Sequence, residues 1–246
     1  MIRLEHVTKE YGRGGKKAVD DLTLHVAAGE LFGFIGPNGA GKTTTIKMIT
    51  GILRPTAGSV YVDGVSMADD PLAAKRRIGF VPDGADLFDR LTGMEYIQFI
   101  ADMYGVSAAD RARRCEEYLS LFEMADSADS LIRTYSKGMK QKIATIGALV
   151  HDPRVWIMDE PLNGLDPRSA YLLKEEMKRQ CAAGKTVFFS THVLEVAEKL
   201  CTRLAIIRGG KLAAEGTLDD LRREENAGSL EEIFLELTEN GDDKND

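Results

Sequence analysis

Residues 36–43 read Gly36-Pro37-Asn38-Gly39-Ala40-Gly41-Lys42-Thr43 and fit the pattern G-x-x-x-x-G-K-[ST]. Glycines let a backbone wrap closely around a chain of phosphates, so that N–H groups and the start of the following helix point at negative oxygens. The apolar residues Leu31–Ile35 predict a strand before this loop, and Ile46, Ile49 and Leu53 predict one face of a helix after it. A glycine turn without a ligand is the alternative, and the strand–loop–helix context argues against it.

The loop supplies the groups that hold a nucleoside triphosphate. Lys42 would reach the β- and γ-phosphates as a point charge, and the Thr43 hydroxyl would ligate Mg²⁺. The predicted ATP-binding residues of this segment are Gly36, Pro37, Asn38, Gly39, Ala40, Gly41, Lys42, Thr43 and Thr44.

Two adjacent carboxylates follow a second apolar strand. Val155–Met158 predicts a buried strand, and Asp159 and Glu160 stand at its C-terminal end, the edge where α/β sheets bind ligands. Adjacent strand residues point to opposite sides, so the two acids should have different roles. We expect Asp159 to ligate Mg²⁺ with Thr43, and Glu160 to polarise an attacking water. Two solvated acids at a strand end are the alternative.

A histidine follows a third apolar strand. His192 comes shortly after Thr186–Phe189, so it should lie at the same edge of the sheet. A histidine at this place can hold the γ-phosphate and orient the water, although a lone histidine is more often structural. We take His192 and Glu160 as the candidate catalytic residues.

The order of patterns predicts the fold class. Further apolar runs at Arg77–Val81 and Leu204–Ile207 indicate central parallel strands, whereas Leu22–Val26 and Val60–Val62 alternate like half-buried strands. Residues 87–152 show helices without a strand signal. We therefore predict an α/β fold: a phosphate-loop NTPase core with a mainly parallel sheet, an N-terminal antiparallel β subdomain and an inserted α-helical subdomain. The expected divisions are 1–86 and 153–216 for the two halves of the core, with the β subdomain in the first, 87–152 for the helical subdomain, and 217–246 for C-terminal helices and a polar tail.

Composition narrows the class of protein. Of the 246 residues 43% are hydrophobic and 29% are charged, a composition that is ordinary for a globular protein. The net formal charge of −7 argues against a protein whose main role is to bind nucleic acid. The longest stretch without Asp, Glu, Lys or Arg, Leu31–Gly41, is too short to cross a bilayer, and the N-terminus lacks the apolar run of a secretory signal. The three cysteines, Cys115, Cys181 and Cys201, are expected to be buried thiols without a disulfide framework.

These motifs, in this order, resemble the nucleotide-binding subunits of ATP-binding-cassette (ABC) transporters over nearly the whole chain. The family's signature, usually L-S-G-G-Q, is similar to Tyr135-Ser136-Lys137-Gly138-Met139, with Gln141 following. The tyrosine, the lysine and the methionine are departures. The resemblance implies that Ser136, Lys137 and Gly138 contact the ATP of a second nucleotide-binding subunit, so that catalysis requires a homodimer or heterodimer. Taken alone, the segment would simply begin a helix.

The resemblance also assigns roles to other residues. Tyr11 lies where members place an aromatic side chain that stacks on adenine. Asn163-Gly164-Leu165-Asp166 matches the loop that crosses the dimer interface, although Asp166-Pro167 is also a good helix start.

Asp83 departs from the family, which usually has glutamine after Val81-Pro82. In the family this glutamine touches Mg²⁺ and water, and its loop contacts the membrane partner. A carboxylate can ligate Mg²⁺ but cannot donate a hydrogen bond while ionised. The hypothesis is that Asp83 keeps the metal contact and alters the timing of hydrolysis, so the predicted metal ligands are Thr43, Asp83 and Asp159.

The resemblance implies an ATPase that uses ATP and Mg²⁺ and drives a separate transmembrane permease. Such a subunit would be cytoplasmic and peripheral on the inner face of the cell membrane through that permease, without a nucleic-acid partner. The variant signature and the residue after Val81-Pro82 resemble the export-type branch of the family. A soluble ABC-type ATPase acting on ribosomes or DNA is the alternative, and recovery of ribosomes without a membrane protein would favour it. A binding module with a dead site is a third possibility, against which the full set of Lys42, Asp159, Glu160 and His192 argues.

Overall fold

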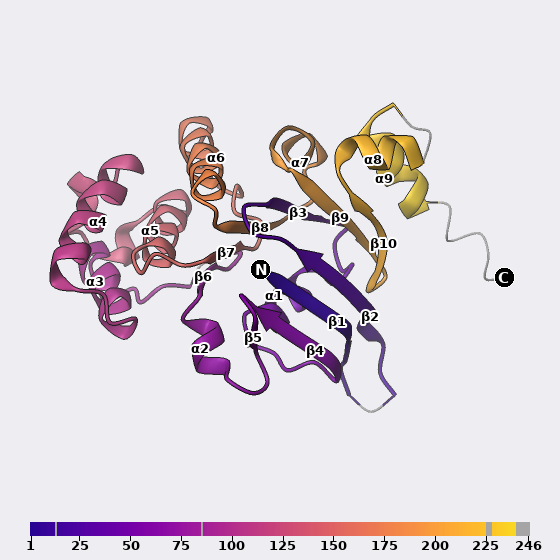
Figure 1. The fold of residues 1–246 in the computed structure, drawn as a ribbon. Helices are drawn as coiled ribbons and strands as arrows, with labels where there is room; N and C mark the ends of the chain where they lie inside the picture. The colour runs from indigo at the N-terminus through magenta and orange to yellow at the C-terminus, as the bar shows by residue number, and fades with distance from the viewer. Residues whose placement is uncertain (13, 85, 225–227, 240–246) are drawn as a thin grey trace.

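Two β-sheets form the centre of the protein, whose computed structural model describes residues 1–12, 14–84, 86–224 and 228–239 (Figure 1). The first sheet is antiparallel, in the order β2 (Lys17–Val26), β1 (Ile2–Glu10), β4 (Ala57–Val62) and β5 (Val65–Ser66). The second has the order β10 (Lys211–Gly216), β9 (Arg203–Arg208), β3 (Leu31–Ile35), β8 (Thr186–Thr191), β7 (Val155–Met158) and β6 (Ile78–Val81). Its neighbouring strands are parallel except for the β9–β10 hairpin. The predicted mainly parallel sheet and N-terminal antiparallel strands are confirmed.

Alternate residues of the parallel strands bury opposite faces of the second sheet. Phe32 and Phe188 pack toward the antiparallel sheet and helix α1 (Lys42–Ile49). Trp156 and Phe189 pack on the other face, toward the helices. Both faces are covered, which explains why these strands read as continuous apolar runs rather than as alternating ones.

Most of the remaining helices cover the second face of this sheet or lie beyond its β6 edge (Figure 1). Their bounds are α2 (Pro71–Lys75), α3 (Gly93–Met103), α4 (Ala108–Leu121), α5 (Lys137–Leu149), α6 (Pro167–Ala182) and α7 (Leu194–Leu200). Two short 3₁₀ helices cover Ala125–Ser127 and Ile132–Thr134. The predicted helical stretch between the two halves of the sheet is confirmed. Helix α3 begins with a capping box, in which Thr92 and Glu95 each accept the other's backbone N–H.

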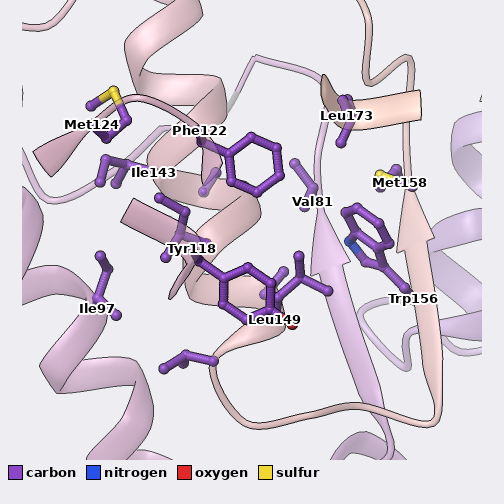
Figure 2. Packing of buried hydrophobic residues seen from close by; sticks show 14 of the residues in the cluster. Val81, Ile97, Tyr118, Phe122, Met124, Ile143, Leu149, Trp156, Met158 and Leu173 are labelled. Atoms are coloured by element: carbon purple, nitrogen blue, oxygen red, sulfur yellow. The ribbon is translucent and has the colours of Figure 1, made fainter. Parts of the chain in front are cut away.

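The inserted helices share one apolar core with the edge of the sheet. Figure 2 shows Val81 of β6 and Trp156 of β7 in the same cluster as Tyr118, Ile143 and Leu149 of the inserted helices. Because this cluster is continuous, the position of the helices is set by packing against β6 and β7 rather than by the connecting segments alone.

Strand β1 was not predicted, and local backbone geometry explains why. Its buried residues Ile2 and Leu4 alternate regularly, but the next buried one is Val7, because His6 adopts a left-handed φ of 50° where the register shifts. Asp21 of β2 has a φ of 56°, and its carboxylate lies 2.9 Å from Nδ1 of His6. Each bulge breaks the period of two that identifies a strand. Helix α1 is also shorter than predicted, since it ends at Ile49 and leaves Leu53 in the segment beyond.

The C-terminal helix α9 (Leu230–Glu239) packs on α7, and α8 (Leu218–Glu224) packs on α9 and on β10. Leu221, Leu230 and Ile233 form a third apolar cluster with Ile35 and Ala197. The predicted polar tail, 240–246, lies outside the described residues. Within the residues that are described, no helix has both the length and the apolar character needed to span a bilayer.

Candidate nucleotide-binding site

The loop between β3 and α1 is held against two neighbouring segments. Gly41 has a φ of 110°, and a Cβ at this position would lie 2.5 Å from the carbonyl oxygen of Ala18. Glycine is therefore required here both by conformation and by space. The N–H of Gly210, in the β9–β10 turn, donates to the carbonyl of Ala40 at 2.9 Å. The predicted strand–loop–helix arrangement is confirmed, and its shape is supported from outside the motif.

Lys42 lies at the floor of this loop. Its side chain is 7% exposed, and Nζ donates to the carbonyl oxygens of Gly36 at 2.6 Å and Pro37 at 3.2 Å. Burial lowers the pKa of the Lys42 ammonium, while the carboxylates of Glu160 and Asp159 oppose this effect. The result is a cation held at the start of α1, where the helix dipole also favours an anion.

The two acids after β7 take different positions, as the strand geometry predicts. Asp159 is 3% exposed, and its Oδ1 accepts a hydrogen bond from the hydroxyl of Ser190 at 2.5 Å. Glu160 leaves the strand with a left-handed φ of 47°. Its Oε1 lies 3.8 Å from Nζ of Lys42, and its Oε2 lies 3.0 Å from Nδ1 of His192. An ionised carboxylate only accepts hydrogen bonds, so Nδ1 of His192 is the donor. The structure therefore joins the phosphate loop, Glu160 and His192 in one site.

One cavity combines the loop with the acids. Its lining residues are Ala18, Pro37, Asn38, Gly39, Gly41, Lys42, Thr43, Thr44, Asp83, Asp159 and Glu160. Asp83, which the sequence separates from the loop by forty residues, thus lies at the same cavity. Gly36 and Ala40 belong to the loop but do not line the cavity, and His192 reaches it through Glu160.

The donor set of this cavity fits Mg²⁺. Thr43, Asp83 and Asp159 offer hydroxyl and carboxylate oxygens, the ligands that this cation prefers. Among the described residues, no group of three or more His, Cys, Asp and Glu side chains gathers as a metal centre. A site with few protein ligands suits Mg²⁺ in nucleotide enzymes, where phosphates and waters complete the coordination shell.

Tyr11, the predicted adenine contact, lies outside this cavity. Tyr11 is half exposed, and Nζ of Lys9 lies 5.6 Å from the centre of its ring. The antiparallel sheet contributes Ala18 of β2 to the lining of the cavity. No pattern around Ala18 marks it, because its place depends on the packing of β2 against Gly41.

The signature segment lies outside this cavity and contacts the predicted dimer loop of its own chain. Ser136 caps α5 by accepting the N–H of Met139 at 3.2 Å, so the predicted helix start is confirmed. A Cβ on Gly138 would lie 3.0 Å from the carbonyl oxygen of Gly164, and one on Gly164 would meet the side chain of Lys137 at 3.0 Å. Ser136 and Lys137 are exposed.

Three residues of these two segments have local structural roles. Asp166 caps α6 by accepting the N–H and the hydroxyl of Ser169, which lowers the pKa of its carboxyl to about 2. Asn163 donates its N–H to the carbonyl of Glu160 at 3.1 Å, which ties the start of the dimer loop to the acid. The tyrosine that replaces the usual signature leucine, Tyr135, is buried and donates its hydroxyl to the carbonyl of Ser127 at 2.6 Å.

Ser190 and Gln141 are site residues whose contacts the sequence did not reveal. Ser190 precedes His192 by two residues and contacts both acids. Gln141 is buried and donates to the carbonyl of Pro161 at 3.4 Å, linking α5 to the segment that follows Glu160. Strand-end polarity marks Ser190 as a candidate, but its partners became evident only from the register of β7 and β8.

Comparison with known proteins identifies related chains. A family model described as ABC transporter matches residues 19–163. The chain is 40% identical over 233 residues to a "Nod factor export ATP-binding protein I" of Paraburkholderia xenovorans (strain LB400), an alignment that covers 95% of this chain and 76% of the relative. A solved "ATP binding subunit of ABC transporter" superposes with a TM-score of 0.92 at 36% identity, over 96% of this chain and 99% of the other. A dimeric ATP-binding cassette in a post-hydrolysis state, bound to ADP and Pi, superposes with a TM-score of 0.80 at 30% identity, over 89% and 99%.

Proposed function

The chain belongs to the ABC transporter family, and from this premise we propose that it is the ATP-hydrolysing subunit that drives a separate membrane permease. The observation that carries the proposal is the position of the Glu160 carboxylate. It lies between Lys42 of the phosphate loop and His192, at a cavity lined by the rest of the loop.

In this proposal each residue acts on one part of the reaction. Lys42 and the loop N–H groups bind the β- and γ-phosphates, since they combine a cation with a helix start. Glu160 accepts a proton from the attacking water. His192 fixes the orientation of that carboxylate through Nδ1, while its imidazole ring faces the γ-phosphate. Thr43, Asp83 and Asp159 would hold Mg²⁺, which neutralises charge on the phosphates.

A second nucleotide-binding subunit completes the site. Ser136, Lys137 and Gly138 are outside the cavity of their own chain, and Ser136 and Lys137 are exposed. The related cassette bound to ADP and Pi is dimeric. We therefore assign these residues to the ATP of the partner subunit, with Asn163, Gly164 and Asp166 at the interface and Tyr11 beside the adenine.

An exposed apolar cluster, formed by Phe88 and by Phe99 and Met103 of α3, is the proposed contact with the permease. Phe88 packs edge-on against Phe99 at 5.6 Å between ring centres, and Met103 lies one turn further along α3. All three side chains are largely exposed. Phe88 follows Asp83 closely in the chain, so the same segment has one end at the nucleotide cavity and the other at this cluster. An apolar helix face of the permease would pack on this cluster, and a movement at Asp83 would be passed to that helix.

The proposal also covers the cellular location of the subunit, the direction of transport and the division of the chain into subdomains. The subunit lies on the cytoplasmic face of the cell membrane through its permease, and the identity to a relative named for export favours export. Residues 1–86 and 153–216 form the ATP-binding core, 87–152 the signature subdomain and 217–246 the C-terminal extension.

The test is to isolate the chain from its native membrane in detergent and to identify the proteins that remain bound in fixed stoichiometry. A multi-span membrane protein that raises the ATPase rate of the chain in proteoliposomes supports the proposal. Inward transport by that complex would reverse the direction, and ribosomes recovered without a membrane protein would overturn the transporter function.

A further inference from the structure

Ser190 contacts both catalytic-site acids at once. Its side chain is fully buried on β8. The hydroxyl donates to Oδ1 of Asp159 at 2.5 Å and accepts the backbone N–H of Glu160 at 3.0 Å. This single hydroxyl thus donates a hydrogen bond to Asp159, the proposed metal ligand, and accepts one from the backbone of Glu160, the proposed base.

The register of the parallel strands places Ser190 there. Met158 of β7 pairs with Phe189 of β8, so the next residue of each strand, Asp159 and Ser190, meet at the end of the ladder. Beyond this point β7 has ended, and Glu160 turns out of the strand with its left-handed φ of 47°. Residues other than glycine rarely adopt this conformation unless the surroundings hold it. The hydrogen bond from the Glu160 N–H to Ser190 is one such restraint.

The end of β8 holds Glu160 at two points. Ser190 binds its backbone, and His192, two residues later, binds its carboxylate. Ser190 lies near the end of β8 and His192 follows the strand directly, so both lie beside the residue that leaves β7. A second neighbour, Thr191, instead accepts the N–H of Val193 and takes no part.

The contact with Asp159 has a separate consequence. Among the described residues, the Ser190 hydroxyl is the hydrogen-bond donor to this buried carboxylate, and it engages Oδ1. The other oxygen, Oδ2, accepts no hydrogen bond from the part of the chain that is described. Fixing one oxygen orients the other, as outer contacts do for metal ligands in general.

We propose that Ser190 is a positioning residue of the ATPase site, which orients Asp159 toward Mg²⁺ and holds Glu160 in its left-handed turn through a single hydroxyl. The proposal rests on the ATPase function proposed above. It predicts that loss of the hydroxyl slows turnover and weakens the response to Mg²⁺, while the loop that binds ATP is untouched.

The test compares Ser190→Ala with Thr186→Val. Thr186 is also fully buried on β8, and its hydroxyl donates to the carbonyl of Ala27 at 2.8 Å, at the opposite end of the strand. Each variant therefore removes one buried hydroxyl from the same strand. For Ser190→Ala we expect kcat to fall about tenfold to a hundredfold, with KM for ATP changed by less than about threefold. For Thr186→Val we expect the parent kcat.

A second measurement does not depend on turnover. The Mg²⁺ concentration that gives half of the ATP-induced dimer is measured by size-exclusion chromatography in the Glu160→Gln background, where ATP is not consumed. It should rise several-fold when Ser190→Ala is added and stay unchanged when Thr186→Val is added. Ser190→Thr keeps the hydroxyl and should restore most of both properties. Thermal unfolding of Ser190→Ala and Thr186→Val checks that the two substitutions lower the stability of the fold by similar amounts.

The outcomes separate the two proposals. If the parent protein neither binds nor hydrolyses ATP, with or without its permease, both proposals are overturned. If the parent is an ATPase and Ser190→Ala keeps its kcat and Mg²⁺ midpoint, the positioning role alone is wrong. The role is equally wrong if Thr186→Val loses activity to the same extent as Ser190→Ala.

Discussion

Oε2 of Glu160 lies 3.0 Å from Nδ1 of His192, and this pair joins the ends of two neighbouring parallel strands. Glu160 is largely shielded, with 12% of its side chain exposed, while His192 is half exposed. A carboxylate oriented by an imidazole N–H at the mouth of a phosphate cavity is suited to accept a proton from water.

Glu160→Gln tests the assignment of the base. The amide keeps the size of the side chain but accepts a proton poorly, so we expect kcat to fall at least about a hundredfold while ATP still binds. ATP should then accumulate a dimer, visible by size-exclusion chromatography with and without nucleotide. ATP hydrolysis at the parent rate would show that Glu160 is not the base.

Lys42→Ala tests the phosphate contact. Removing the buried cation should weaken ATP binding about tenfold or more, since a charge-assisted contact to phosphate is lost. Fluorescence titration with a labelled ATP analogue measures the change. Lys47→Ala is the matched control, because Lys47 is exposed on the same helix and should leave the affinity unchanged.

Asp83→Ala tests the acid that stands where relatives have glutamine. If Asp83 contacts Mg²⁺, its loss should raise the Mg²⁺ requirement and change the steady-state ATPase rate, whereas Asp83→Gln should restore the turnover but not the tight Mg²⁺ response. ATPase rates over a range of Mg²⁺ concentrations provide the measurement. Unchanged Mg²⁺ dependence and turnover in Asp83→Ala would refute the metal contact.

The buried imidazole of His151 should make the fold less stable in mild acid. Burial lowers the pKa of its imidazole to about 4, and its ring stacks on Tyr104 with 3.6 Å between ring centres. Its Nδ1 is buried and has no hydrogen-bond partner among the described residues. The unfolded chain binds a proton near pH 6.5 and the folded chain does not, so stability is full above pH 6.5 and falls as the pH drops toward 4. The expected loss is about 1 kcal/mol for each pH unit in this window.

Urea unfolding at pH 7.5 and pH 5.5 measures this loss. His151→Gln removes the titrating group and should show a smaller difference between the two pH values than the parent. An equal difference in both proteins would assign the acid sensitivity to other groups.

The C-terminal helices offer a test of the third apolar cluster. Ile233 is fully buried, so Ile233→Ala should lower the free energy of unfolding by about 2–4 kcal/mol. Leu235, two residues along the same helix, is 43% exposed, and Leu235→Ala should cost less than about 1 kcal/mol. Thermal or urea unfolding of both variants decides whether α9 is an integral part of the fold.

Much of the fold was readable from local patterns. The phosphate loop, the apolar runs of the parallel strands and the helix start at Ser136 depend on residues within a few positions of one another. Strand β1 was missed for the opposite reason, because the bulge at His6 is stabilised by Asp21 of another strand and removes the regular alternation.

The sequence by itself determined which chemical groups this protein carries: a phosphate loop with Lys42, two acids after an apolar strand, and a histidine after another. Those are properties of short segments, whose backbone conformation follows from glycine content and hydrophobic period. Only the tertiary structure decided how the segments meet. The register of β7 and β8 places Ser190 between Asp159 and Glu160, and close packing brings Gly138 to Gly164 and Ala18 to the loop. Such contacts join residues far apart in the chain, so they are set by the shared burial of many side chains and leave no local mark in the sequence.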